Sequence, residues 1–307
     1  MLTNEDAVKS SKKYTMQAFR RGLVPYTYLS PTIILMVVLM LIPIVMVISY
    51  SMMNNVVMEK NPVLVYGENY ATILTDKVFQ QALFNTLYFT VVSVIFHFAI
   101  GLSFAMLLNT KLLKSFTTSL FRVVYVLPWV FTATIIAILW RLMLNPNGIV
   151  NYILNSAGII STKIEWFSSK QVALHALTFL NVWSGYPFFM ISLLAGLQGI
   201  PSDLYEAATI DGCNGFQRFK NITIPQLMPI IMSMAMLDVI WTMQQFPLVW
   251  LTTGGGPIHA TEMLSTFTYK LAFSSYEFSL ASTSAVIILL ISMCIALFYV
   301  RNQKARD

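Results

Sequence analysis

Six long apolar stretches constrain what this chain can fold into more than any other feature. Each is long enough to cross a hydrocarbon layer about 30 Å thick as a helix rising about 1.5 Å per residue. Apolar residues make up 57% of the 307 residues and charged residues only 10%, whereas soluble domains carry about 25% charged residues. We therefore predict an all-α membrane protein with six transmembrane helices at Pro31–Tyr50, Phe84–Leu108, Val123–Trp140, Ala173–Leu197, Pro229–Leu251 and Phe278–Val300.

Prolines and basic residues refine this prediction. Ser30-Pro31 predicts the start of the first helix, because serine is a good N-cap and proline suits the first helical position. If residues 1–30 form a cytoplasmic N-terminal segment and 301–307 a cytoplasmic tail, 13 of the 19 Lys and Arg residues lie on the inside and 6 on the outside. This asymmetry is typical of the positive-inside rule and predicts that both termini are cytoplasmic. The net charge of +6 thus reports membrane orientation and not a nucleic-acid partner.

Sequence patterns for catalysis and cofactor binding are absent. The chain has no GxxxxGK[ST] phosphate loop, no GxSxG elbow, and no His or Cys residues at metal-ligand spacing. We therefore expect no catalytic residue, no metal and no cofactor on this chain. His97 and His175 could relay protons, since ionisable groups inside membranes are often functional. We favour neutral imidazoles that are satisfied between helices.

The inside segment from Gln198 to Pro225 is the longest link on the cytoplasmic side. Asp203 and Glu206 predict a capping box at the start of a short helix, and Gly212 a left-handed residue after its end. A second short helix with Phe216 and Phe219 is expected to run to Pro225. A capped helix pair with exposed aromatic residues is typical of a docking element for a soluble partner. The alternative is a helix pair lying on the headgroups, but small residues at 207 and 208 would anchor it poorly.

Glu206-Ala207-Ala208, then Asp211-Gly212 and Ile222-Thr223-Ile224-Pro225, resemble the EAA loop of ABC importer permeases. Over about residues 25–300, the chain resembles the carbohydrate-uptake branch of these permeases, of the maltose and glycerol-phosphate type. The motifs that carry this second resemblance are Asn69-Tyr70, Asp76, Phe79, Asn85-Thr86, Leu127-Pro128, Gly199-Ile200-Pro201 and Gly254–Pro257.

The resemblance implies a type I ABC importer permease fold over residues 31–300 and a location in the bacterial cytoplasmic (inner) membrane. The implied partners are a second homologous permease in a heterodimer, two cytoplasmic ATPase subunits that hold ATP and Mg, and an extracytoplasmic solute-binding protein. The ATPase-coupling residues would be Glu206, Ala207, Ala208, Asp211 and Gly212. The chain lacks the large extracytoplasmic insertion of the best-known maltose permease, which leaves the binding-protein contacts undefined.

Two helix faces predict a solute pathway. Asp238 is the only carboxylate inside a predicted span, and its spacing to Trp241 and Gln245 puts all three on one helical face, next to Thr242. Amides and aromatic plates together are typical of sugar sites. The resemblance implies sugar contacts at Asn181, Ser184, Gly185, Phe188, Trp241, Thr242 and Gln245, and we add Asp238. Ordinary hydrogen bonding between helices is the alternative.

The sequence leaves three other functions open. An ion-coupled carrier working alone would show inverted repeats and buried titratable pairs, and the sequence reveals no repeat and one acid within a predicted span. An ABC permease for a non-sugar solute, such as an amino acid or phosphate, is the second. A membrane-embedded enzyme is the third, but no nucleophile and base stand at a suitable spacing. We therefore expect a permease subunit of an ATP-driven sugar importer.

Overall fold

The computed structural model describes residues 26–110 and 114–304, and these residues are helical apart from loops and one isolated β-bridge between Met53 and Leu64. Within these described residues, five helices are long and apolar enough to cross a membrane, and a sixth crossing results if one bent pair counts as a single span. The spanning segments are Tyr26–Ser51, Lys77–Asn109, the pair Phe116–Val130 and Ala133–Met143, Ala173–Gly199, Gly215–Met243 and Phe278–Arg301. The prediction of an all-α protein with six transmembrane segments is confirmed.

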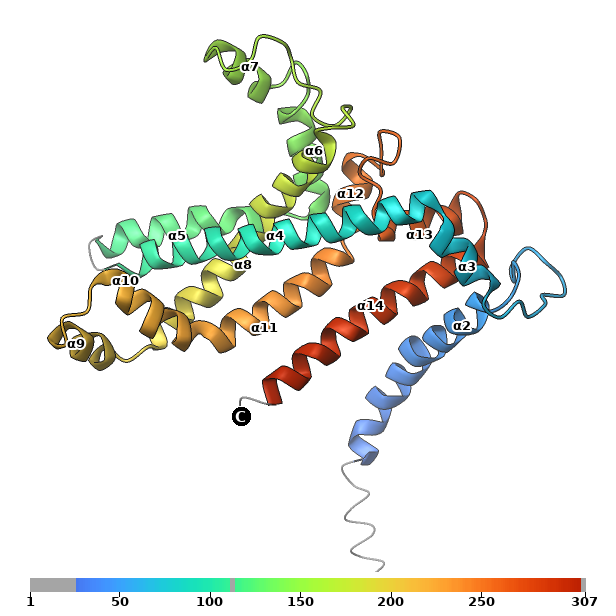
Figure 1. Cartoon of the computed structure of the whole chain (residues 1–307), viewed down its shortest axis with the longest axis horizontal. Helices are drawn as coiled ribbons and strands as arrows, with labels where there is room; N and C mark the ends of the chain where they lie inside the picture. Colours follow the sequence, from blue (N-terminus) through green and yellow to red (C-terminus); the bar gives the residue numbers. More distant parts are fainter. Residues whose placement is uncertain (1–25, 111–113, 305–307) are drawn as a thin grey trace, which may run out of the picture.

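The centre of the bundle is the pair α4 (Lys77–Asn109) and α8 (Ala173–Gly199), which lie side by side along most of their length (Figure 1). Gly101 permits this close approach, because a Cβ there would lie 2.6 Å from the Cβ of Phe189. Around the pair, α5 (Ser115–Val130) packs on α8, and α11 (Ile224–Met243) packs on α4. The two central helices thereby position side chains from several spans around a common interior.

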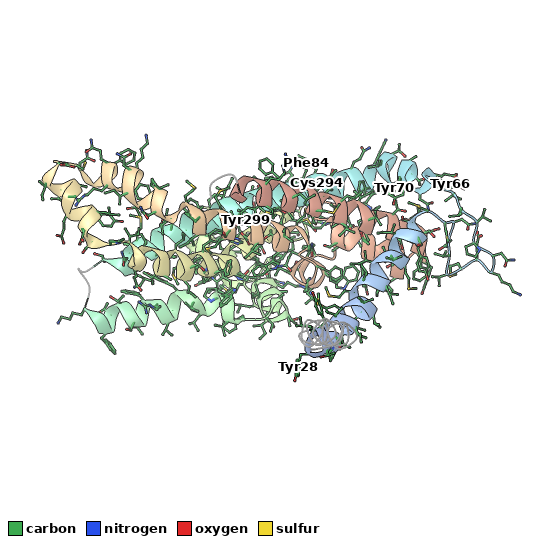
Figure 2. All side chains as sticks on the ribbon, turned by 90° about the horizontal axis from the view of Figure 1, so that it is seen from below. Tyr28, Tyr66, Tyr70, Phe84, Cys294 and Tyr299 are labelled. Atoms are coloured by element: carbon green, nitrogen blue, oxygen red, sulfur yellow. The ribbon has the colours of Figure 1, made fainter. Side chains whose placement is uncertain are left out.

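The first span stands apart from this centre. Its second half, α2 (Ile42–Ser51), packs on α14 (Phe278–Lys304), while residues 26–46 are largely exposed on this chain (Figure 1). Figure 2 shows Tyr28 pointing away from the other helices. The predicted N-cap at Ser30 is wrong, because the chain is already helical at residue 26. The Ser30 hydroxyl instead donates to the carbonyl of Thr27 at 2.9 Å, which supplies the hydrogen bond that Pro31 has no N–H to make.

The third span is not the single helix predicted at Val123–Trp140. It consists of α5 and α6 (Ala133–Met143), which meet at an angle of 97°. The chain is extended at Phe131, and the Thr132 hydroxyl accepts a hydrogen bond from the N–H of Ile135 to cap the new helix. A threonine N-cap competes with continued helix at this point, and apolar periodicity carries no sign of it.

The fifth span also differs from the predicted Pro229–Leu251. Its helix begins at Gly215, passes through a π-helical turn η2 (Phe219–Thr223) and ends at Met243. The second short helix predicted to stop at Pro225 is therefore wrong. Pro225 lies two residues after the π turn, and a local π adjustment can accommodate the missing backbone donor of a proline within a membrane helix. A separate short helix, α12 (Pro247–Thr252), begins after the break.

Opposite ends of the bundle carry different connections. One end holds α9 (Ser202–Ile210) and α10 (Gly215–Arg218), and the other holds α3 (Glu68–Thr75) and α13 (Leu264–Phe273) (Figure 1). A further short helix, α7 (Ile149–Ser156), follows α6 and projects from the bundle. Most of the predicted cytoplasmic segment 1–30 and part of the predicted tail 301–307 lie outside the described residues, namely residues 1–25 and 305–307.

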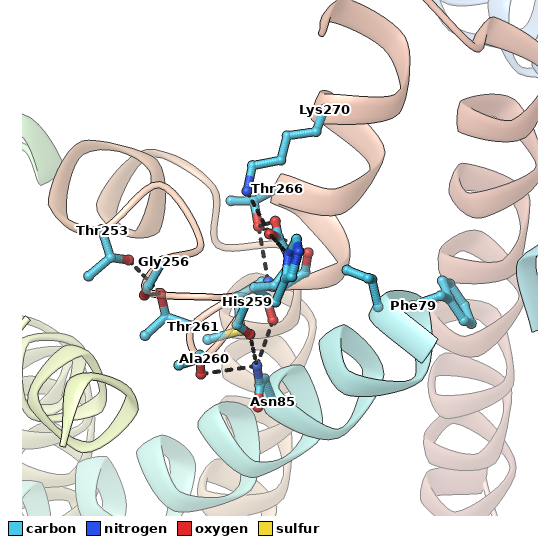
Figure 3. Close-up of polar contacts among 12 residues, drawn as sticks. Phe79, Asn85, Thr253, Gly256, His259, Ala260, Thr261, Thr266 and Lys270 are labelled. Atoms are coloured by element: carbon cyan, nitrogen blue, oxygen red, sulfur yellow. Dashed lines mark hydrogen bonds and ion pairs between the residues drawn. The ribbon is translucent and has the colours of Figure 1, made fainter. Parts of the chain in front are cut away.

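The loop between α12 and α13 is fixed by buried polar side chains (Figure 3). The amide of Asn85 on α4 donates to the carbonyls of His259, Ala260 and Glu262 at 3.0–3.3 Å. The Glu262 carboxylate is fully buried and contacts both Lys270 and His259. This buried acid lies outside the predicted spans, and the sequence alone did not single it out.

Candidate functional site

A cavity of about 270 Å³ lies among α4, α8, α11 and the break between α5 and α6. All eight residues predicted to contact the solute line it: Asn181, Ser184, Gly185, Phe188, Asp238, Trp241, Thr242 and Gln245. The structure also adds wall residues that the sequence did not predict, namely His97, Pro128, Trp129, Phe131, Ala133, Ile136 and Leu248. The two predicted helix faces thus meet at one cavity, although the role of these residues stays a prediction.

Gln245 reaches the cavity by a different route from the one predicted. The spacing from Asp238 assumed one continuous helix, but α11 ends at Met243 and Gln245 lies in the break before α12. Its amide Nε2 lies 3.5 Å from Oδ1 of Asn181. The break therefore turns Gln245 toward α8. Helical periodicity correctly predicted that Gln245 lies near Asp238 and Trp241, although it assumed one continuous helix.

A buried pair of titratable groups forms the polar wall of the cavity. Nδ1 of His97 lies 2.7 Å from Oδ2 of Asp238, and the Thr242 hydroxyl donates to Oδ1 of the same carboxyl group at 3.1 Å. His97 is 2% exposed and lies on α4, while its partner lies on α11. The expectation that His97 is satisfied between helices fits these contacts, but its position at the cavity was missed. The signal that could have found it is that the predicted spans contain one acid and only two histidines, so that a pair between the acid and one histidine could have been considered.

Gly185 makes room for this pair. A Cβ at position 185 would lie 2.3 Å from Nε2 of His97, inside van der Waals contact. The ring thereby sits against the backbone of α8, where its Nε2 lies 2.9 Å from the carbonyl oxygen of Asn181. Since a carbonyl only accepts hydrogen bonds, Nε2 carries the hydrogen of this contact.

Asn181 and the aromatic residues place an unpaired hydrogen-bond donor and aromatic faces at the same cavity. The amide nitrogen of Asn181 is buried and has no hydrogen-bond partner among the residues that the structure describes. The rings of Phe188 and Trp241 lie 5.5 Å apart, and Trp129 lies 6.3 Å from Phe188. A buried unpaired donor is costly unless a ligand or water meets it, and aromatic faces suit the apolar side of a sugar ring.

His175, the other histidine considered for proton relay, lies elsewhere. Its Nδ1 is 2.8 Å from the hydroxyl of Tyr88, and both residues line a separate cavity with Lys170 and His259. That cavity is formed by α4, the start of α8 and the loop after α12. No contact joins His175 to the His97–Asp238 pair among the interactions of the described residues.

The predicted coupling residues cluster on α9 and the turn that follows it. The capping box predicted for Asp203 is wrong, because α9 begins at Ser202 after Pro201 and has no side-chain cap. Asp203 lies in the first turn, where a carboxylate still interacts favourably with the helix dipole. A capping box occurs instead on the next helix, between Asn214 and Gln217.

Gly212 adopts the predicted left-handed conformation, with φ of +77°. Its N–H donates to the carbonyl of Thr209 and that of Cys213 donates to Ala208, which is the hydrogen-bond pattern of a Schellman C-cap. Of the predicted coupling residues, Glu206, Ala207, Asp211 and Gly212 are exposed, whereas Ala208 is buried against its own chain. The Tyr205 hydroxyl, 2.9 Å from that of Thr223, holds α9 against the following helix.

A bundle of apolar helices around a cavity, with a short helix pair at one end, is the architecture expected of a membrane permease. Residues 97–306 match the family of the binding-protein-dependent transport system inner membrane component. The chain belongs to this family and is a transport permease subunit. The importer-permease family inferred from the EAA-like loop is therefore confirmed.

Curated relatives and solved structures agree with this family. The chain is 31% identical over 292 residues to the trehalose/maltose transport system permease protein MalF of Thermococcus litoralis, covering 94% of this chain and 96% of the relative. It is 29% identical over 281 residues to the sulfoquinovosyl glycerol transport system permease protein SmoG of Agrobacterium fabrum, covering 91% and 90% of the two chains. Its fold matches a chain of a bacterial ABC transporter that imports alginate, with a TM-score of 0.81, 21% identity, and coverage of 95% and 99%.

Proposed function

We propose that this permease carries a sugar or oligosaccharide through the cavity lined by Asn181, Asp238 and Trp241, in an importer driven by ATP. The observation that carries the proposal is the buried, unpartnered amide of Asn181 in a cavity that also presents Trp241 and Phe188. Neutral hydrogen-bonding groups beside aromatic faces are the features that bind sugars. The names of the trehalose/maltose and sulfoquinovosyl glycerol relatives support the same class of solute.

The proposed importer contains further chains. The exposed face of α9 would dock a cytoplasmic ATPase, two copies of which bind ATP and Mg, so that this chain binds no cofactor. The apolar surface of residues 26–46 is covered by lipid and by a second, homologous permease, most simply as a heterodimer. An extracytoplasmic solute-binding protein delivers the sugar, and both termini and the 198–225 segment face the cytoplasm. These assignments rest on the family and on the basic-residue asymmetry.

The test is uptake by the complete importer in proteoliposomes. The chain is purified with its co-expressed neighbouring permease, ATPase and binding protein, and labelled neutral and acidic sugars, amino acids and phosphate are offered outside. We expect a sugar to accumulate only when ATP is inside and the binding protein outside. Uptake of an amino acid or phosphate but no sugar would overturn the sugar assignment.

The same assay separates an importer from an ion-coupled carrier. The carrier hypothesis predicted a buried titratable pair, and His97 with Asp238 is such a pair. Family membership nevertheless favours the ATP-driven importer. Uptake by this chain alone, driven by a proton or sodium gradient without ATP, would favour the carrier.

A further inference from the structure

We propose that the membrane cavity selects an uncharged sugar, and that the His97–Asp238 pair makes it reject sugars that carry a carboxylate, sulfonate or phosphate. This inference rests on the proposed function and narrows its substrate class. It follows from the number of protons in the pair, from the atoms that face the cavity, and from the charges of the cavity lining.

The contacts of His97 fix how many protons the pair holds. Nε2 carries a hydrogen, because its partner at 2.9 Å is the backbone carbonyl of Asn181. The 2.7 Å contact between Nδ1 and Oδ2 of Asp238 then needs one further proton, since two bare acceptors would repel. That proton sits either on the ring, giving imidazolium and carboxylate, or on the carboxyl group, giving two neutral groups. The pair has no net charge in either form.

The two members of the pair differ in what they offer the cavity. Both ring nitrogens of His97 are engaged, and the side chain is 2% exposed, so the positive end of the pair is occupied within the protein. The Asp238 side chain is 10% exposed. Each of its oxygens makes one protein hydrogen bond, with His97 or with Thr242, and retains capacity to accept another. A solute therefore meets hydrogen-bond acceptors here and no free cation.

Apart from His97, no cationic side chain lies beside the Asp238 carboxyl group in the described cavity lining. Among the described residues that line the cavity, none is Lys or Arg. The remaining polar groups, including Asn181, Gln245 and Ser184, are neutral. A sugar hydroxyl can donate to Asp238 while another accepts from the free amide of Asn181, so a neutral sugar satisfies both groups. An anionic group would lose its hydration next to Asp238 without gaining a counter-charge, which is strongly unfavourable inside a protein.

The decisive measurement is direct binding to the membrane complex without the binding protein, which would otherwise impose its own selection. The complex of both permeases and the ATPase is placed in nanodiscs. Labelled maltose and trehalose, and the counterparts of each with one CH₂OH oxidised to a carboxylate, are the probes. Of maltose and trehalose, we consider the one that binds more tightly. We expect its affinity to exceed that of its acidic counterpart by a ratio of at least about tenfold, a difference of about 1.4 kcal/mol.

Two near-isosteric variants separate the effect of the acid from that of its partner. Asp238→Asn removes the acid and offers an N–H donor in its place, so the ratio should fall. His97→Asn keeps both the acid and a donor near it, so the ratio should not fall below its wild-type value. If Asp238 had a purely structural role, Asp238→Asn would weaken the binding of both probes equally and leave the affinity ratio unchanged. The double variant, which carries neither group, should resemble Asp238→Asn.

The outcomes separate this inference from the proposed function. If the complete importer accumulates a sugar but the wild-type complex binds acidic probes as tightly as neutral ones, or binds no neutral probe, the selection proposal is wrong while sugar transport stands. An Asp238→Asn complex that retains the wild-type ratio also overturns it. Absence of any sugar uptake by the complete importer overturns the proposed function itself.

Discussion

The α-carbon of Gly185 faces the imidazole of His97 so closely that a Cβ would lie 2.3 Å from its Nε2 and 2.4 Å from its Cε1. Position 185 thus controls whether the ring can reach the carbonyl of Asn181 and the carboxyl group of Asp238. A helix residue with no hydrogen-bonding side chain of its own thereby determines the polar geometry of the cavity.

Gly185→Ala is therefore expected to impair solute uptake strongly. The methyl group must displace the ring or separate α4 from α8, and overpacking of this kind costs about 1–3 kcal/mol. The matched control is Gly199→Ala on the same helix, where a Cβ would meet nothing within 4 Å. Uptake and co-purification of the complex measure both variants. Equal uptake by the two would mean that His97 does not need its present position.

Gly212→Ala should weaken coupling while leaving membrane insertion intact. A Cβ at a left-handed position costs about 1 kcal/mol, and the Schellman hydrogen bonds that end α9 depend on that conformation. Gly215→Ala is the control, because Gly215 also has open space but no positive φ. Stimulation of ATP hydrolysis by the loaded binding protein is the measurement. A Gly212→Ala importer that is stimulated like Gly215→Ala would remove the turn from the coupling mechanism.

Glu206→Ala tests the proposed ATPase contact directly. Glu206 is exposed on α9, and its removal costs the fold little because the helix keeps its C-cap and its Tyr205–Thr223 contact. We expect loss of the ATPase subunit during purification, or ATP hydrolysis that no longer responds to solute. Asp203→Ala, another exposed acid on the same helix, should retain both properties. The coupling assignment fails if the two alanine variants behave alike.

Topology can be tested with two of the most exposed apolar residues. Ile210 is 87% exposed at the end of α9, and Ile258 is 79% exposed on the loop between α12 and α13. With Cys213 and Cys294 replaced by serine, a cysteine at 258 should react with a membrane-impermeant maleimide added to intact cells. A cysteine at 210 should react only after the membrane is permeabilised. The reverse pattern would invert the orientation inferred from the basic residues.

The sequence predicted the elements that depend on apolar length and missed those that depend on local hydrogen bonds. Ala173–Leu197 nearly matches α8, because one uninterrupted apolar run leaves helix as the only way to satisfy its backbone in lipid. The bend at Thr132 and the break after Met243 were missed. A single potential N-cap or proline inside an apolar run does not determine whether the helix continues or ends there.

For the candidate site, helical periodicity predicted the faces of α8 and α11 but not their shared neighbour, His97 on α4. Asn181, Gly185 and Phe188 follow one helical period, so they point the same way whatever packs against them. The contact between His97 and Asp238 joins residues 141 positions apart. Nothing in the local pattern of α4 predicts this contact, because it depends on how α4, α8 and α11 pack together.

Gln245→Ala and Trp241→Ala test the cavity itself. Gln245 lies 3.5 Å from Asn181 across the break after α11, and Trp241 is 57% exposed beside Phe188. Removing one side chain that contacts the bound sugar should cost about 1–3 kcal/mol, or roughly five- to 150-fold in affinity at the membrane site. Uptake at low sugar concentration should fall accordingly. Assembly and stimulation of the ATPase by the binding protein should persist, because both residues lie at the C-terminal end of α11, whereas α9 and α10 precede its N-terminal end. The matched control is Trp250→Ala, an aromatic residue on α12 that stacks on Phe246 and lies outside the cavity lining. If the variants at 241 and 245 transport at the rate of this control, the two side chains only join helices, and the solute crosses the membrane elsewhere.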